Sequence, residues 1–159
     1  NEIDGYTLLT LTEQDMMDRI RPMRTQPKTK GGAITKAAVE VGKIVDAKFL
    51  VAFTKSGDSA RRMSRLRSPI PILALTPDPA TFNQLALSWG IESMIMPMVS
   101  HTDEMVKQVD SLLVESGRGV VGENVMIVAG SPPGIPGSTN AMRVHRVGDA
   151  VSGAAPAYR

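Results

Sequence analysis

The most constraining feature of this sequence is an apolar run that ends abruptly at a polar turn. Residues 49–53 read Phe-Leu-Val-Ala-Phe, which is typical of a parallel strand covered on both faces. Residues 54–59 then read Thr-Lys-Ser-Gly-Asp-Ser, and residues 60–66 have helical composition. A strand, a turn and a helix in this order direct backbone N–H groups and the positive helix end at one point, which favours binding of a phosphate.

The rest of the chain repeats this alternation of strand and helix. Apolar runs at residues 72–75, 91–98 and 125–129 predict three more strands, and residues 140–147 alternate as in a half-exposed edge strand. Apolar residues at helical spacing predict helices at 33–47, at 79–89 with Asp78 as the N-cap, and from about 103 to 117.

Single helices between strands imply right-handed crossovers and parallel pairing. The last two strands are joined by a loop without a helix, so they are expected to be antiparallel neighbours. The predicted fold class is therefore α/β, a three-layer doubly wound sheet of five strands, mostly parallel with the last strand antiparallel.

Composition places the chain among ordinary globular proteins. It has 159 residues, 42% of them hydrophobic and 21% charged, which fits one domain with a sizeable core. A net charge of +2 and an aromatic content of 4% do not favour nucleic acid as a partner. The chain has no Cys, which excludes disulfides and Cys-ligated zinc and fits a cytoplasmic location, and no apolar run is long enough to span a membrane.

We expect three segments along the chain. Residues 1–32 form an N-terminal extension and linker, residues 33–148 the α/β domain, and residues 149–159 a flexible tail. Within the extension, residues 8–11 suit a short strand, residues 12–20 suit a helix capped by Thr12, and residues 21–32 contain Pro and Gly among four bases.

Three polar segments follow predicted strands, where open α/β sheets bind their ligands. These are residues 54–59, 76–78 and 130–140. The first and third are rich in glycine, hydroxyl groups and other small residues, which can donate backbone hydrogen bonds to phosphate oxygens. Ordinary turns that serve short connections are the alternative, and spacing alone does not exclude them.

Groups that could carry catalysis are sparse. His101 falls at a helix cap and His145 on the predicted edge strand, and both are expected to be exposed and structural. The chain has no nucleophile elbow, no Walker loop and no carboxylate cluster that suggests a metal site. A base for an enzyme acting on a phosphorylated metabolite would have to be Asp58, Asp78 or His145. The arginines of the helix after residue 59 are expected to be solvated, although one could reach a ligand or a partner; they are Arg61, Arg62, Arg65 and Arg67.

Four segments in register carry a resemblance to a known family. Residues 47–61, 69–76, 85–90 and 137–140 resemble, in order and spacing, the C-terminal domain of pyruvate kinase. The match extends over roughly residues 30–147, and the sequence of residues 128–134 is most similar to that of actinobacterial members.

The resemblance implies a fold, a site and a partner. The family's C-terminal domain is a doubly wound five-stranded sheet that holds the allosteric effector site and one tetramer interface. The turn at 54–59 would bind one phosphate of the effector, with hydroxyl groups from Thr54, Ser56 and Ser59 and backbone groups from Lys55 and Gly57. The loop after residue 129 would close over the sugar, and the last strand would lie near a neighbouring subunit of a homo-oligomer. The residues of that closing loop are Gly130, Ser131, Gly134, Gly137, Ser138 and Thr139.

Two departures from the family pattern bear on the effector. Members that bind fructose 1,6-bisphosphate often have a Trp or Arg in the closing loop or nearby, and residues 131–134 have neither. Asp58 stands where some members place a base, and a carboxylate there would repel phosphate. The expected effector is therefore a monophosphate such as glucose 6-phosphate, ribose 5-phosphate or AMP.

The family's catalytic apparatus has no counterpart in this sequence. Its acidic metal ligands and phosphate-facing Lys lie in a barrel domain, so we expect no catalytic residue and no cofactor in this chain; Mg and K would belong to the full enzyme. The leading hypothesis is a fragment or free-standing copy of the regulatory domain, with a catalytic barrel as partner if full length. The rivals are an independent small α/β enzyme and an interaction module whose turns bind nothing.

Overall fold

A computed structural model describes residues 27–131, 133, 135 and 137–150 of the chain. The predictions made for residues 1–26 and 151–159, and for Gly134 in the closing loop, lie outside them.

Five strands form one sheet in the order β3-β2-β1-β4-β5. β1 pairs in parallel with β2 and with β4, β2 pairs in parallel with β3, and β4 pairs antiparallel with β5. The strands are β1 (Leu50–Phe53), β2 (Ile72–Thr76), β3 (Ile91–Ile95), β4 (Asn124–Gly130) and β5 (Thr139–Arg146). The predicted fold class, with its antiparallel last strand, is confirmed.

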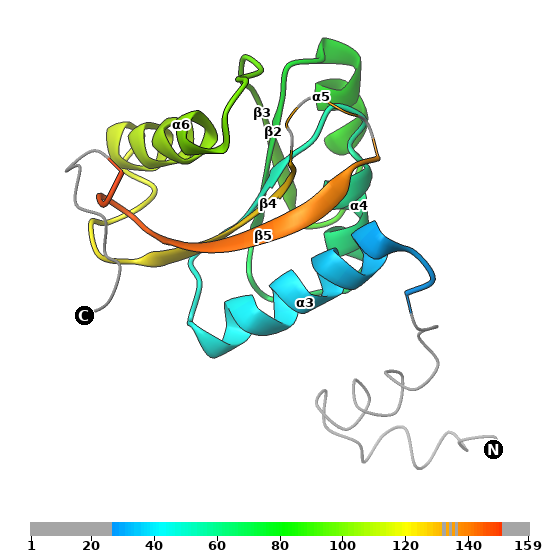
Figure 1. Cartoon of the computed structure of the whole chain (residues 1–159), viewed down its shortest axis with the longest axis horizontal. Helices are drawn as coiled ribbons and strands as arrows, with labels where there is room; N and C mark the ends of the chain where they lie inside the picture. Colours follow the sequence, from blue (N-terminus) through cyan, green and yellow to red (C-terminus); the bar gives the residue numbers. More distant parts are fainter. Residues whose placement is uncertain (1–26, 132, 134, 136, 151–159) are drawn as a thin grey trace.

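Helices cover both faces of this sheet, as Figure 1 shows for α3 and α6. The four described helices are α3 (Lys30–Ile44), α4 (Asp58–Arg65), α5 (Pro79–Leu85) and α6 (Thr102–Glu115). Two buried clusters separate the layers. One holds Val39 of α3 and Met63 of α4 with Leu50 of β1, and the other holds Val109 of α6 with Val51. Neighbouring residues of β1 thus point to opposite faces, which explains why the whole run is apolar.

Helix boundaries differ from the predictions by a few residues. α3 begins at Lys30 rather than residue 33, because the hydroxyl of Thr29 accepts a hydrogen bond from the N–H of Gly32 and caps the helix. α5 ends at Leu85, so Trp89 does not belong to its apolar face. The Trp89 ring is half exposed, and the Arg67 guanidinium lies 4.8 Å from its centroid.

The prediction of an exposed His145 was wrong. β5 is an edge strand as expected, but the side chain of His145 is only 4% exposed, while Met142 and Val144 are 40% and 43% exposed. The physical reason is a polar partner: Asp110 of α6 lies beneath this end of β5 and accepts a hydrogen bond from the imidazole. A paired histidine can be buried where an unpaired one cannot.

Candidate anion-binding site

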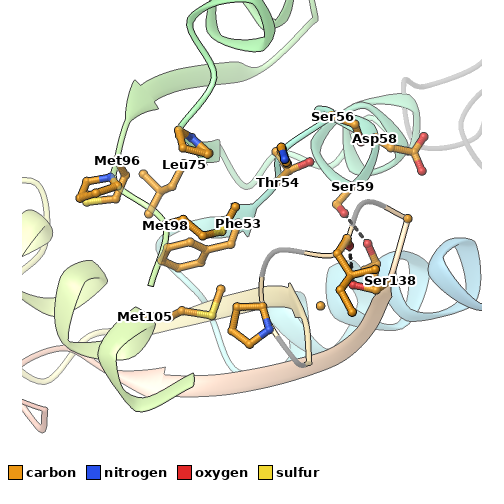
Figure 2. Close-up of a pocket in the computed structure, with 18 residues that line it drawn as sticks. Phe53, Thr54, Ser56, Asp58, Ser59, Leu75, Met96, Met98, Met105 and Ser138 are labelled. Carbon is orange, nitrogen blue, oxygen red and sulfur yellow. Dashed lines mark hydrogen bonds between the residues drawn. The ribbon is translucent and has the colours of Figure 1, made fainter. Parts of the chain in front are cut away.

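The two loops predicted to bind an anion lie together at the carboxyl end of the sheet. One follows β1 and the other follows β4, and these strands are neighbours at the centre of the sheet. A cavity of about 50 Å³ opens between the loops (Figure 2). It offers the space of a few water molecules, so a small group such as a phosphate fits inside and the rest of a ligand would extend through its open mouth.

Most of the predicted site residues line this cavity. From the first loop they are Thr54, Lys55, Ser56 and Ser59, and from the second Gly130, Gly137, Ser138 and Thr139. Gly57 and Ser131 belong to the same loops but are not part of the lining.

The first loop has its own internal hydrogen bonds. Gly57 has φ +77°, a left-handed conformation that suits glycine, and its buried N–H donates to the Thr54 hydroxyl over 2.9 Å. The Arg61 guanidinium folds back and donates to the Ser56 carbonyl over 2.6 Å. The hydroxyl of Thr81 in α5 lies 2.8 Å from the Lys55 carbonyl oxygen and holds the loop from the other side. The turn is therefore fixed by contacts that leave its cavity-facing surface open.

α4 starts at this turn without a side-chain cap. Gly57 occupies its N-cap position and has no side chain that could accept a hydrogen bond from the first turn. The first N–H groups of a helix have no acceptor within the helix, so those of α4 remain as donors beside the cavity. The chemistry that the arrangement offers is anion binding.

The second loop is held closed at its base. The side-chain amide of Asn140 both accepts from the N–H of Ser131 and donates to its carbonyl oxygen, at 2.7 Å in each case. The Ser138 hydroxyl donates to the carbonyl of Ile135 over 2.6 Å. The two loops meet where the hydroxyl oxygens of Ser59 and Thr139 lie 2.6 Å apart.

The opposite wall of the cavity is apolar, which the sequence reasoning missed. Figure 2 shows Phe53, Met96, Met98 and Met105 on one side and Thr54 and Ser59 on the other. Met96 and Met105 contribute to this wall, and Met105 is at the same time a buried core residue that is only 3% exposed. A signal was available, because residues 96–98 lie at the carboxyl end of the strand predicted at 91–98, and the observed strand already ends at Ile95.

Charge in the cavity is limited. Among the described lining residues, Lys55 is the one basic side chain and Asp58 the one acidic side chain. The Asp58 carboxylate does not point into the cavity. In Figure 2 it turns away, and its Oδ2 lies 2.7 Å from Nε of Arg62. The expectation that Asp58 repels a bound phosphate is weakened by this pairing.

Each residue considered as a general base has a structural partner. Asp58 is paired with Arg62, and His145 with Asp110. Asp78 caps α5. Hydrogen bonds from the side chain and then the backbone N–H of Thr81 lower the pKa of the Asp78 carboxyl and outweigh the opposing effect of burial. The Ala80 N–H and the charge of Lys55 lower this pKa by smaller amounts.

The described part of the chain contains no group of three or more His, Cys, Asp or Glu residues that could hold a metal ion. None of its helices has the length and apolar character needed to cross a membrane.

Comparison with known proteins gives a consistent result. A family model described as "Pyruvate kinase, alpha/beta domain" matches residues 32–145. The chain is 50% identical over 128 residues to a pyruvate kinase of Mycobacterium intracellulare, and 42% identical over 131 residues to one of Corynebacterium glutamicum. These matches cover 80% and 82% of this chain. It spans only 27% and 28% of the two relatives.

Solved structures support the fold. A crystal structure of a pyruvate kinase from Cryptosporidium parvum superposes with a TM-score of 0.73 at 22% identity and covers 89% of this chain. A second crystal structure of pyruvate kinase from that organism gives a TM-score of 0.70.

Proposed function

This chain belongs to the pyruvate kinase α/β domain family, and from that membership we propose that it is a regulatory domain that binds a phosphorylated effector and is not catalytic alone. The observation that carries the proposal is the meeting of two loops and the uncapped start of α4 around one small cavity. The interaction-module hypothesis gives no role to this convergence.

The phosphate of the effector would lie against the loop after β1. N–H groups from the first turn of α4, hydroxyl groups of Ser56 and Ser59 and the ammonium of Lys55 supply donors from one side. Two or three charge-assisted hydrogen bonds of about 1.5–3 kcal/mol each are enough to bias an equilibrium between two quaternary states. Thr54 shapes the turn through Gly57 and presents its own hydroxyl to the cavity.

The lining favours an effector with one phosphate. Lys55 is the one basic side chain among the described lining residues, so a second phosphate would find no further side-chain cation there. The apolar wall of Phe53, Met98 and Met105 suits a neutral sugar ring or a nucleoside. We therefore favour glucose 6-phosphate, ribose 5-phosphate or AMP over fructose 1,6-bisphosphate.

In a complete pyruvate kinase this domain would act on a catalytic barrel domain that is not part of this chain. That barrel, with its Mg and K, would transfer phosphate between phosphoenolpyruvate and ADP. Effector binding would shift the enzyme toward the quaternary state that binds it more tightly. β5 is the natural contact with a second copy, because it is an edge strand with exposed Met142 and Val144.

The proposal is tested by thermal-shift titration of the 159-residue chain. The panel is glucose 6-phosphate, ribose 5-phosphate, AMP, fructose 1,6-bisphosphate and inorganic phosphate. At a hundredfold excess over its dissociation constant, a specific ligand stabilises the fold by about 2.7 kcal/mol. Ser56→Ala and Ser59→Ala should reduce the shift. Ser116→Ala is the matched control, since Ser116 lies at the end of α6 and does not line the cavity.

A shift with a monophosphate that both site variants weaken supports the proposal. If no member of the panel shifts the melting temperature, that result contradicts effector binding and favours the interaction module. Turnover of phosphoenolpyruvate and ADP by this chain alone would contradict a purely regulatory role. Sedimentation of the wild type and of Val144→Lys tests the contact through β5. If that contact joins two copies of the chain, the Val144→Lys variant should dissociate.

A further inference from the structure

We infer that Arg62 is a positioning residue of the candidate site: it holds the Asp58 carboxylate away from the cavity and so preserves the site's affinity for anions. The inference rests on the proposed function, because it concerns the same site. It concerns a residue that does not itself line the cavity.

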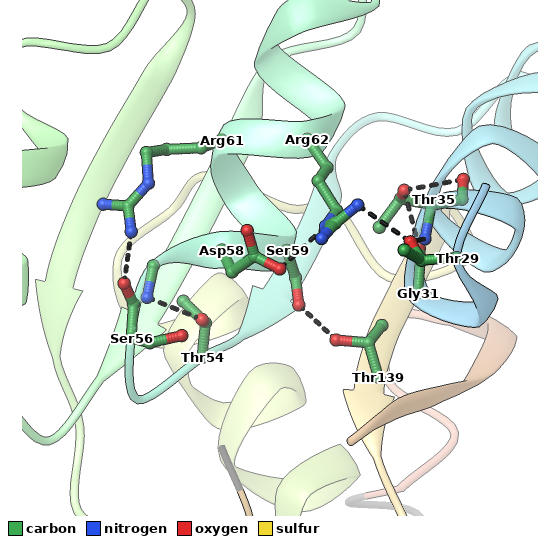
Figure 3. A network of polar contacts seen from close by, with 12 residues as sticks. Thr29, Gly31, Thr35, Thr54, Ser56, Asp58, Ser59, Arg61, Arg62 and Thr139 are labelled. Atoms are coloured by element: carbon green, nitrogen blue, oxygen red, sulfur yellow. Dashed lines mark hydrogen bonds and ion pairs between the residues drawn. The ribbon is translucent and has the colours of Figure 1, made fainter. Parts of the chain in front are cut away.

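The contacts of Arg62 reach two elements at once (Figure 3). Its Nε donates to Asp58 Oδ2 over 2.7 Å, one helical turn back in α4. Its Nη1 donates to the Thr29 hydroxyl over 3.0 Å, and that hydroxyl also accepts from the N–H of Gly32 at the start of α3. The guanidinium is thus fixed between the first residue of α4 and the N-cap of α3.

This double contact determines where the Asp58 carboxylate lies. Asp58 is the first residue of α4, at the point where a phosphate would approach, and it borders the cavity. With Arg62 in place, its charge is paired and directed toward α3 (Figure 3). Without Arg62, an unpaired carboxylate would stand beside Lys55 and Ser59 and oppose a dianion by Coulomb repulsion.

The geometry calls for arginine rather than any cation. The planar guanidinium reaches a carboxylate with one nitrogen and a hydroxyl with another, whereas a lysine ammonium is a single point charge on a flexible stem. The side chains of Arg62 and Asp58 are 31% and 43% exposed, so the pair adds little to stability. The pair instead determines how much negative charge a ligand meets at the cavity.

The test is a double-mutant cycle in the 159-residue chain, with inorganic phosphate and glucose 6-phosphate as probes. Binding is followed by calorimetry and by amide NMR shifts of the loop after β1. Arg62→Gln should weaken the binding of both probes by about threefold to tenfold. This is the effect expected when an unpaired Asp58 carboxylate lies a few ångströms from a dianion in physiological salt. Arg62→Gln with Asp58→Asn should return to within about twofold of the wild type. Asp58→Asn alone should bind at least as tightly as the wild type.

The control is Arg65→Gln, because Arg65 is exposed on the same helix and does not line the cavity. It should leave both affinities unchanged. If the single Arg62→Gln variant and the double variant are equally weak, Arg62 acts by packing or by touching the ligand, and the inference is wrong. If Arg62→Gln binds like the wild type, it is also wrong.

Two further outcomes can be distinguished from these: failure of the wild type to bind either probe, and failure of the Arg62→Gln variant to fold. If the wild type binds neither probe, the proposed function fails and the inference fails with it, before any variant is compared. If Arg62→Gln does not fold, Asp58→Asn and Arg62→Lys carry the test. Weaker binding by Asp58→Asn would overturn the inference. Intermediate affinity of Arg62→Lys, raised to the wild-type level by adding Asp58→Asn, would support it.

Discussion

The imidazole of His145 lies against the carboxylate of Asp110, with Nε2 3.1 Å from Oδ1, and both side chains are buried. The same carboxylate accepts hydrogen bonds from the N–H of Gly148 over 2.6 Å and from the N–H of Ala150 over 3.0 Å. One side chain of α6 therefore binds the end of β5 and the segment that follows it.

Asp110→Asn should destabilise the domain strongly. The Asp110 carboxylate accepts from three N–H donors, those of His145, Gly148 and Ala150. The amide of an asparagine would place its own NH₂ group against at least one of them, and that donor would be left unpaired in a buried site. We expect a loss of about 2–4 kcal/mol in the free energy of unfolding, measured by urea denaturation. Glu115→Gln, on the exposed end of the same helix, should change stability by less than about 0.5 kcal/mol. Equal stability of the two variants would mean that the contact contributes nothing.

Thr54→Val should damage the loop after β1, whereas Thr54→Ser should spare it. Valine has a similar shape but no acceptor for the buried N–H of Gly57, and an unpaired buried donor costs about 1–3 kcal/mol. Serine keeps the oxygen. Urea denaturation and titration with inorganic phosphate should both separate the two variants. Similar behaviour of the two would show that the hydroxyl does not shape the turn.

Asp78→Ala should lower the thermal midpoint at neutral pH and have a smaller effect in acid. Hydrogen bonds from Thr81 lower the pKa of Asp78 below its ordinary value of 3.8 in the folded state. The ionised carboxylate therefore stabilises the fold above pH 3.8, and this contribution is lost as the pH falls through the lower, folded-state pKa. Melting curves of wild type and variant, recorded from neutral to acidic pH, should converge. A gap that stays constant would assign the effect to something other than the charged cap.

The sheet could be predicted because its evidence is local. The apolar run of β1 continues on both faces, and the loop between β4 and β5 leaves no room for a crossover helix. The environment of His145 could not be predicted in this way. Its burial depends on Asp110, 35 residues earlier in the chain, and no pattern within residues 140–147 reports that partner.

The candidate site could also be predicted only in part. Its two loops were found from the rule that ligands bind at the carboxyl ends of strands. The contacts that hold the loops join distant segments: Arg62 to Thr29, Thr81 to Lys55 and Asn140 to Ser131. The sequence shows the residue types, but which side chain bonds to which backbone group follows only from the packed structure. Asp58 is the clearest case, because its charge is visible in the sequence and its pairing is only one of several arrangements that the sequence allows.

The hydroxyl pair of Ser59 and Thr139 has a consequence for the order of events during synthesis. The two residues are 80 positions apart, and Thr139 is the first residue of the last strand in the sheet. A contact of such separation forms late in folding, because a long loop must first be closed. On the ribosome, the loop after β1 emerges well before the strand that completes its cavity. A growing chain therefore has a complete pocket only after β5 has been made and has paired with β4.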